Sequence, residues 1–239
     1  MFALIGAVVL AGGAGKRMGA GINKQYLNID GYSVLSYALR SMASVAEEFI
    51  VAVAAGEEER ACFAAQEAGI DPWRVHIVIG GRERQDSVRH ALDAMSADWQ
   101  VVLIHDGARP FIPPEVLERL LRAVGHDVGA VPCMPVTDTI KRVDENGYVL
   151  ETPLRSTLRA AQTPQCFIAR EIQTLHHMAL MEGITATDDA ALFEHYGKAV
   201  KVVDGSPLAK KLTYAADMED ALRLKKEWEA LYYASRNRL

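Results

Sequence analysis

A glycine-rich segment near the start of the sequence carries residue types suited to holding a polyphosphate. Residues 10–18 read Leu-Ala-Gly-Gly-Ala-Gly-Lys-Arg-Met. Glycines let the backbone approach a ligand closely and turn N–H groups toward an anion. The guanidinium of Arg17 can grip phosphate oxygens as a fork, and Lys24 supplies a movable positive charge. The pattern predicts a phosphate site with backbone contributed by Gly12, Gly13 and Gly15.

The spacing of these residues excludes two common phosphate loops. A P-loop needs Gly-Lys followed by Ser or Thr, whereas Gly15-Lys16 is followed by Arg17, and Leu10 stands where the first glycine belongs. A dinucleotide loop counted from Gly13 would need a third glycine where Met18 stands. Residues 54–56, after the second predicted strand, offer no acid for a ribose. The sequence therefore argues against a nicotinamide dehydrogenase.

An alternation of strands and helices is expected to position the glycine segment. We predict strands at residues 2–10, 49–53, 75–79, 99–104 and 128–132, and helices at residues 33–43 (Ser33 near the N-cap), 57–68, 83–95 and 113–124. This rhythm predicts an α/β fold of Rossmann-like, doubly wound type: a mostly parallel sheet with helices on both faces. Polar loops follow the first, third and fourth strands and should meet at one edge of the sheet, where such folds bind ligands.

The rhythm changes after residue 135. Residues 137–143 and 148–154 resemble two strands joined by Asp-Glu-Asn-Gly, and Asn-Gly is a strong hairpin signal. Their many charges favour an arm, at about residues 136–156, that projects from the sheet. An isolated hairpin is marginally stable in water, so we expect the arm to pack on a second subunit; the alternative is a hairpin folded back on its own domain. Further predicted elements are helices at 170–181, 188–196 and 217–233, and a strand at 199–203.

Composition limits the classes of function. The 239 residues carry a net charge of -5, which argues against a dedicated nucleic-acid binder. The isolated Cys62, Cys133 and Cys166 suggest neither a zinc site nor disulfides and are expected to be free buried thiols. Residues 1–10 are expected to be a strand rather than a signal peptide, and no apolar run is long enough for a membrane. We therefore expect a cytoplasmic protein with a single domain over residues 1–239.

Several further blocks occur in one order along the chain. They are Gly80-Gly81 through Arg84, Asp86-Ser87, His-Asp-Gly-Ala-Arg-Pro at 105–110, Pro-Val-Thr-Asp-Thr-Ile-Lys at 135–141, Gln-Thr-Pro-Gln at 162–165 and Thr-Asp-Asp-Ala at 187–190. With the glycine segment and Lys24-Gln25-Tyr26, they make residues 7–222 resemble the 2-C-methyl-D-erythritol 4-phosphate cytidylyltransferase family. The resemblance implies a nucleotide-diphospho-sugar transferase type of fold and a homodimer joined through the arm.

The resemblance also implies a reaction and its residues. A polyol phosphate would attack the α-phosphorus of CTP, with Mg²⁺ bridging the phosphates and pyrophosphate leaving, in isoprenoid precursor synthesis by the non-mevalonate pathway. Such transfers need positioning and charge neutralisation rather than a protein nucleophile. The implied catalytic residues are Arg17, Lys24 and Lys211. The implied nucleotide-binding residues are Ala11, Gly12, Gly13, Gly15, Gly81, Arg84, Ser87 and Asp106. The implied substrate-binding residues are Asp106, Arg109, and Thr139 and Arg155 reaching from the arm into a neighbouring subunit.

Some assignments stay open at the level of sequence. Asp106 is the carboxylate expected nearest the metal or ribose, and the alternative is an N-cap or turn aspartate. Ser87 bonds the nucleotide or packs within its helix, and Asp188 is expected to cap a helix. Leu208 and Ala209 stand where the family often has Asp-Asn, so Lys210 competes with Lys211 for the α-phosphate. The alternative substrate is another polyol phosphate, such as ribitol 5-phosphate. A non-catalytic nucleotide sensor is disfavoured because it would not need Arg17, Lys24 and Lys211 together.

Overall fold

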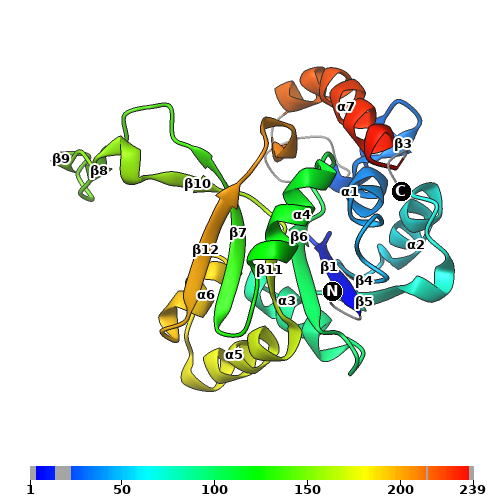
Figure 1. Ribbon diagram of the computed structural model, residues 1–239, viewed down its shortest axis with the longest axis horizontal. Coiled ribbons are helices and arrows are strands. Elements are labelled where there is room, and N and C mark those ends of the chain that lie inside the picture. Colours follow the sequence, from blue (N-terminus) through cyan, green and yellow to red (C-terminus); the bar gives the residue numbers. More distant parts are fainter. Residues whose placement is uncertain (1–3, 14–22, 214, 237–239) are drawn as a thin grey trace.

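A mostly parallel sheet forms the centre of the molecule (Figure 1). The computed structural model describes residues 4–13, 23–213 and 215–236. Within them, β1 pairs in parallel with β4 and β6, β4 with β5, and β7 with β12, whereas β11 runs antiparallel between β6 and β7 and β10 runs antiparallel to β7. The strands are β1 (Ile5–Leu10), β4 (Glu48–Val53), β5 (Val75–Ile79), β6 (Val101–Asp106), β7 (Val128–Pro135), β10 (Arg159–Ala161), β11 (Gln165–Ile168) and β12 (Ala199–Asp204).

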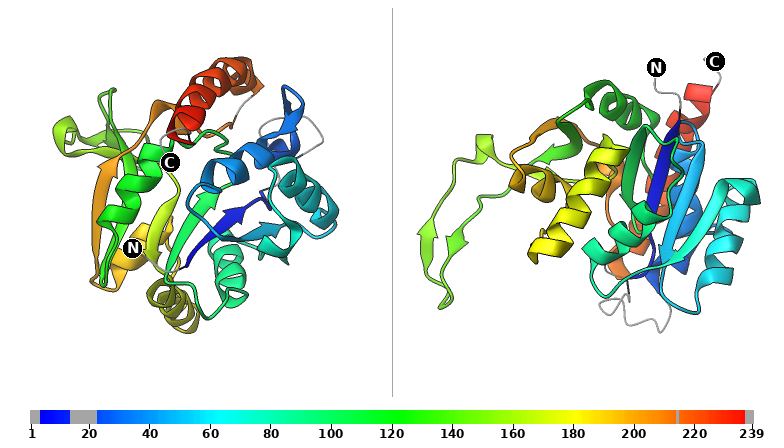
Figure 2. Two further views of the ribbon diagram at one scale, coloured as in Figure 1. Left: turned by 45° about the vertical axis from the view of Figure 1, so that its right-hand side comes forward. Right: turned by 90° about the horizontal axis from the view of Figure 1, so that it is seen from below.

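Helices cover both faces of this sheet, as the sequence predicted (Figures 1 and 2). Side chains alternate along each strand, so Ala7 and Val9 of β1 enter one buried cluster while Val8 enters the other. The first cluster includes side chains of α1 (Val34–Met42), α2 (Glu58–Glu67) and α4 (Pro114–Ala123). The second includes side chains of α3 (Arg84–Asp93), α5 (Ala169–Glu182) and α6 (Asp189–His195). The predicted Rossmann-like α/β fold is therefore confirmed.

The long helix α7 (Ala215–Arg236) packs beside α1 through an aromatic cluster. Trp228 is fully buried against Tyr37 and Phe111, and its indole N–H donates to the carbonyl of Ile112 at 2.9 Å. The same cluster buries Leu212. Helix α7 therefore fixes both the segment after β6 and the loop that precedes the helix.

The arm is present, but its strands are shorter than predicted. β8 (Arg142–Val143) and β9 (Val149–Glu151) are the paired part, and the arm extends away from the body of the molecule (Figure 2). Many of its apolar side chains are exposed, among them Tyr148, Val149 and Leu154. The predicted pairing over 137–143 and 148–154 was wrong in extent, because the other residues of these two ranges form no strand pairing.

Other expectations met mixed outcomes. The Ser33 hydroxyl accepts from the N–H of Ser36 and caps α1, as predicted. Cys133 and Cys166 are buried, but Cys62 is exposed because α2 turns Ala61 and Ala64 toward the core instead. Strands β10 and β11 were not predicted from the sequence. No helix among the described residues is long and apolar enough to cross a membrane. The remaining short elements are β2 (Asn28–Ile29), β3 (Tyr32–Ser33) and 3-10 turns at Lys24–Tyr26, Pro72–Arg74, Arg155–Thr157 and Pro207–Ala209.

Candidate active site

A cavity of about 370 Å³ lies at the carboxyl ends of β1, β5 and β6. Its volume falls in the usual range for small-molecule sites, about 300–1,000 Å³. The position is the edge of the sheet at which the sequence predicted the polar loops to meet. The described lining residues are Leu10, Gly12, Gly13, Lys24, Gln25, Gly81, Arg82, Glu83, Arg84, Ser87, Asp106, Ala108 and Lys211.

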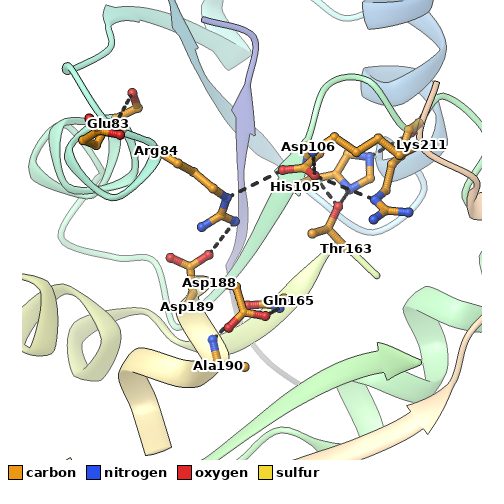
Figure 3. A network of polar contacts seen from close by, with 12 residues as sticks. Glu83, Arg84, His105, Asp106, Thr163, Gln165, Asp188, Asp189, Ala190 and Lys211 are labelled. Carbon is orange, nitrogen blue, oxygen red and sulfur yellow. Dashed lines mark hydrogen bonds and ion pairs between the residues drawn. The ribbon is translucent and has the colours of Figure 1, made fainter. Parts of the chain in front are cut away.

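The Asp106 carboxylate, at the end of β6, collects the positive groups of this site (Figure 3). Lys211 Nζ donates to Asp106 Oδ2 at 2.7 Å. Arg84 Nε lies 3.7 Å from Oδ1, and Arg109 Nε lies 3.8 Å from Oδ2. Burial alone would raise the pKa of the Asp106 carboxyl, but Lys211, Arg84 and Arg109 outweigh burial and hold that pKa well below its usual range. Asp106 is therefore ionised and cannot serve as a proton donor near neutral pH.

The loop after β5 forms the opposite wall of the cavity. Ser87 Oγ accepts from the N–H of Gly81 at 3.0 Å and donates to the carbonyl of Glu83 at 3.1 Å. A Cβ on Gly81 would collide with the side chain of Asp86, so only glycine fits where this loop meets α3. Ser87 therefore fixes the loop and also lines the cavity, and its contact with the nucleotide stays a prediction.

The segment after β1 is held by a buried amide. Gln25, which is 2% exposed, donates from Nε2 to the carbonyl of Ala11, and the N–H of Ala11 donates to Ala52 O at 2.7 Å. These bonds leave Gly12 and Gly13 at the cavity, with Lys24 beside them. Gly15 and Arg17 lie outside the described residues, so their predicted roles rest on the sequence.

The loop that carries Lys211 is fastened at several points. Gln162 binds both backbone groups of Ser206, accepting from N at 3.1 Å and donating to O at 2.9 Å. Arg109 Nη1 donates to Ala209 O at 2.7 Å. Lys210 instead turns to α7, where its Nζ lies 2.8 Å from Asp217 Oδ1. Of the two lysines, Lys211 is the one that lines the cavity.

Leu208 and Ala209 are buried in hydrophobic clusters, so the departure from Asp-Asn contributes packing and a backbone carbonyl rather than polar side chains. Arg109 does not line the cavity. Its placement is that of a support for Asp106 and the Lys211 loop. Thr139 and Arg155 do not line the cavity either; both are exposed on the arm, where Arg155 Nη1 donates to Thr137 O at 2.8 Å.

A buried histidine fixes the turn at Asp106. The N–H of Asp106 donates to Thr163 Oγ1 at 3.1 Å, which leaves the Thr163 hydroxyl to donate to His105 Nδ1 at 3.0 Å. His105 Nε2–H then donates to the carbonyl of Arg109 at 2.9 Å. Both ring nitrogens of His105 therefore have a hydrogen-bond partner. Burial lowers the pKa of His105 from 6.5 to about 4. The imidazole is therefore neutral at physiological pH and acts as a rigid spacer.

Comparison with known proteins agrees with this geometry. Residues 5–224 match the family model described as IspD, 2-C-methyl-D-erythritol 4-phosphate cytidylyltransferase. The chain belongs to this family. It is 44% identical over 216 residues to the 2-C-methyl-D-erythritol 4-phosphate cytidylyltransferase of Saccharopolyspora erythraea, covering 89% of this chain and 95% of that protein. The corresponding protein of Thermosynechococcus vestitus is 40% identical over 222 residues, covering 91% and 93%.

Solved structures of the family support the same conclusion. The 4-diphosphocytidyl-2C-methyl-D-erythritol synthase of Anaerococcus prevotii superposes with a TM-score of 0.80 at 27% identity, covering 93% of this chain and 96% of that one. Another relative is the bifunctional IspD/IspF enzyme of Chelativorans, 42% identical over 218 residues, of which this chain spans 53% of the length. The predicted class of enzyme, a cytidylyltransferase, is therefore confirmed.

The cavity has too few protein ligands in its described lining to hold a metal ion alone, so the fit is to a metal ion that the substrate phosphates also bind. Among the described residues, no three His, Cys, Asp or Glu side chains are grouped to hold a metal. Asp106 and Glu83 are the carboxylates in the described lining, and Asp106 already faces Lys211 and Arg84. Mg²⁺ is commonly held by one or two carboxylates together with substrate phosphates and water. Of these two carboxylates, Asp106 is the one that lies among the cations of the cavity, and it is the candidate ligand.

Sequence reasoning missed several supporting residues. Thr163 and Gln162 belong to a block that was noticed only as a resemblance, and Asp189 belongs to another. Their roles depend on strand β11 lying between β6 and β7, which brings residues 162–165 beside His105. The polar residues within these two blocks, at 162–165 and 187–190, were the available signal.

We expect His105 to make the protein less stable toward mild acid. Between pH 6.5 and pH 4 the unfolded chain binds a proton at this position and the folded chain does not, so the free energy of unfolding falls as pH falls through that window. A shift from 6.5 to about 4 corresponds to about 3 kcal/mol. Urea unfolding measured from pH 7 to pH 4 should show a weaker pH dependence for His105→Gln than for the exposed control His195→Gln. Equal slopes in the two variants would contradict the assignment.

Proposed function

We propose that this protein transfers the cytidylyl group of CTP to 2-C-methyl-D-erythritol 4-phosphate. A phosphate oxygen of the polyol forms a bond to the α-phosphorus, the bond from that phosphorus to the bridging oxygen of the β-phosphate breaks, and pyrophosphate leaves with the electron pair. The observation that carries the proposal is the set of cationic side chains, Lys24, Arg84 and Lys211, around a cavity built on glycine backbone. Family membership supplies the nucleotide and the polyol.

The described residues suit a reaction driven by positioning and charge. Transfer at phosphorus needs neutralisation of oxygens that gain negative charge, and preorganised cations supply it without rearranging. Asp106 holds Lys211 in place through the 2.7 Å bond, so the ammonium is set before the nucleotide arrives. Lys24 faces the same cavity from the segment after β1. Arg17, which precedes Lys24 in the sequence, is proposed to contact the same phosphates. A bound Mg²⁺ ion would supply neutralisation of the phosphate charge, with Asp106 as its protein ligand.

The walls of the cavity suit the base and ribose of CTP. Ala11, also predicted to bind the nucleotide, does not line the cavity, and its backbone groups bond Gln25 and Ala52 instead. The backbone of Gly12 and Gly13 on one side, and the loop from Gly81 to Ser87 on the other, line the cavity, where backbone N–H and C=O groups can reach a ligand. Cytosine offers one exocyclic amine and two acceptors, which such groups can satisfy. Arg84 stands between this loop and Asp106, where it can contact the ribose or the α-phosphate.

The polyol phosphate is proposed to be held by the arm of a second subunit. Thr139 and Arg155 are exposed and do not line the cavity of their own chain, and the arm that bears them extends away from the sheet (Figure 1). The exposed Tyr148, Val149 and Leu154 give the arm an apolar surface that a homodimer would cover. Arginine suits a phosphate dianion because it binds two oxygens at once. We also propose that the enzyme is cytoplasmic.

The substrate is tested by pyrophosphate release from CTP and Mg²⁺ with purified protein. We expect release with 2-C-methyl-D-erythritol 4-phosphate and background release with ribitol 5-phosphate, because the family match names the first polyol. Release with ribitol 5-phosphate alone would keep the chemistry and change the substrate. No release with either would favour a nucleotide-sensing domain.

Lys211 and Lys210 provide a matched pair of variants. Lys211→Ala should lower kcat by about 10²–10³-fold, the usual cost of removing one preorganised charge donor. Lys210→Ala should leave kcat nearly unchanged, because Lys210 forms a partly exposed ion pair with Asp217. Steady-state kinetics with saturating CTP measures both. A larger loss for Lys210→Ala would show that the assignment of the two lysines is reversed.

Sharing of the arm is tested by mixing inactive variants. If Arg155 serves the partner's cavity, a mixed dimer of Arg155→Ala and Lys211→Ala contains one intact site. An equal mixture that exchanges subunits should then recover about a quarter of wild-type activity. A mixture of Arg155→Ala and Thr139→Ala is the control, since every site then receives a defective arm. Recovery in neither mixture would indicate that the arm serves its own chain.

A further inference from the structure

A fully buried carboxylate stands behind the nucleotide wall of the cavity. Asp189, the first residue of α6, is 1% exposed, and Arg84 Nη2 donates to its Oδ2 at 2.7 Å. Arg84 is therefore shared by two carboxylates, with Asp189 at hydrogen-bond distance and Asp106 at 3.7 Å (Figure 3). The closer partner lies outside the cavity lining, which shows that the guanidinium is held from behind.

The position of Asp189 is itself fixed by bonds to β11. Gln165 Oε1 accepts from the N–H of Ala190 at 2.9 Å, and Gln165 Nε2 donates to Asp188 Oδ2 at 2.8 Å. Asp188 Oδ1 caps the helix by accepting from the N–H of Ala191 at 2.8 Å. The start of α6 is thus fastened to a strand that pairs with β6, which bears Asp106. The side chain of Arg84 lies between the carboxylates of Asp106 and Asp189, and the pairing of β11 with β6 fixes the distance between them.

The other oxygen of Asp189 is also occupied. His176 Nε2, on α5, lies 3.1 Å from Asp189 Oδ1, and both side chains are 1% exposed. Among the described residues, His176 Nδ1 has no hydrogen-bond partner, so the bond to Asp189 is the polar contact that this imidazole makes there. Burial would raise the pKa of Asp189, but Arg84 and then His176 outweigh it and lower the pKa to about 2. The carboxylate is charged, satisfied on both oxygens and rigid.

We propose that Asp189 is a positioning residue that holds Arg84 in the orientation that binds CTP, with His176 as its second support. Without the charge on Asp189, the nearest remaining anion for Arg84 is Asp106. Arg84 would then move onto Asp106 and compete with Lys211 for the same carboxylate. One buried charge therefore keeps apart two cations, Arg84 and Lys211, that the reaction needs in different places. This inference rests on the proposed function.

The test is a cycle of variants at both residues. Asp189→Asn preserves shape, because the amide oxygen can still accept from Arg84, but it removes the charge. We expect kcat/KM for CTP to fall about 10- to 100-fold, because the charge that strengthens the hydrogen bond to Arg84 is gone and hydrogen bonds to charged groups are worth about that much. In an Arg84→Ala background, the same change should have almost no further effect, because the residue through which Asp189 acts is gone. Thermal unfolding of each variant reports whether the fold is kept.

Two further variants keep the test decisive. Glu171→Gln, which removes another helix carboxylate paired with a histidine and lies outside the cavity lining, should leave CTP kinetics unchanged. His176→Asn should give a smaller loss of the same kind, also absent in the Arg84→Ala background, and it stands in if Asp189→Asn does not fold. An undiminished loss in that background, or wild-type kcat/KM in Asp189→Asn, would overturn the proposal.

Direct binding separates this inference from the proposed reaction. Calorimetric titration with CTP alone should show weaker binding to Asp189→Asn than to the unsubstituted protein. If the unsubstituted protein binds CTP but releases no pyrophosphate with any polyol phosphate, the reaction is wrong and the comparison of CTP affinities still decides the role of Asp189. Equal affinities would overturn that role, and so would the absence of CTP binding by the unsubstituted protein.

Discussion

The site depends on one carboxylate at the end of one strand. Asp106 gathers Arg109 from its own turn and Lys211 and Arg84 from segments that are distant in sequence, and it does so while largely buried. Three cations held this close would repel one another and resist burial, and a fixed anion among them offsets both effects. The rest of the local structure serves this arrangement: His105 and Thr163 orient the backbone of Asp106, and α7 packs down the loop of Lys211. A nucleoside triphosphate then binds to cationic side chains that are already in place.

Individual strands and helix caps were easier to predict from the sequence than the pairing of distant strands. Strand β5 and the caps of α1 and α6 agree with the structure because period, propensity and capping act over a few residues. The meeting of the loops after β1, β5 and β6 was also predictable, because parallel strands point their carboxyl ends the same way. The antiparallel β10 and β11 were not, since Ala160, Ala161 and Pro164 carry no strand pattern. Their pairing depends on partners far along the chain.

The candidate site shows the same division. Residue types that face a ligand, such as Lys24, Arg84 and Lys211, follow recognisable blocks and line the cavity. Residues that act through others, such as Gln162 and Asp189, depend on which side chain a tertiary contact brings opposite them. The choice between Lys210 and Lys211 belongs to this second kind, because Asp217 of α7 draws Lys210 away. Local chemistry thus suggests candidates, and packing selects among them.

The order of the site residues along the chain has a consequence for synthesis on the ribosome. The backbone of Gly12 and Gly13 emerges early, whereas Lys211 follows β12, and its loop is buried only when α7 has formed. A growing chain therefore contains the sheet strands β1, β4 and β5 long before it contains the lysine that pairs with Asp106. Until then the Asp106 carboxylate lacks its closest partner, and the incomplete protein presents a less positive cavity to cellular nucleotides. The chain can therefore complete its triphosphate site only late in synthesis, when α7 packs into the aromatic cluster.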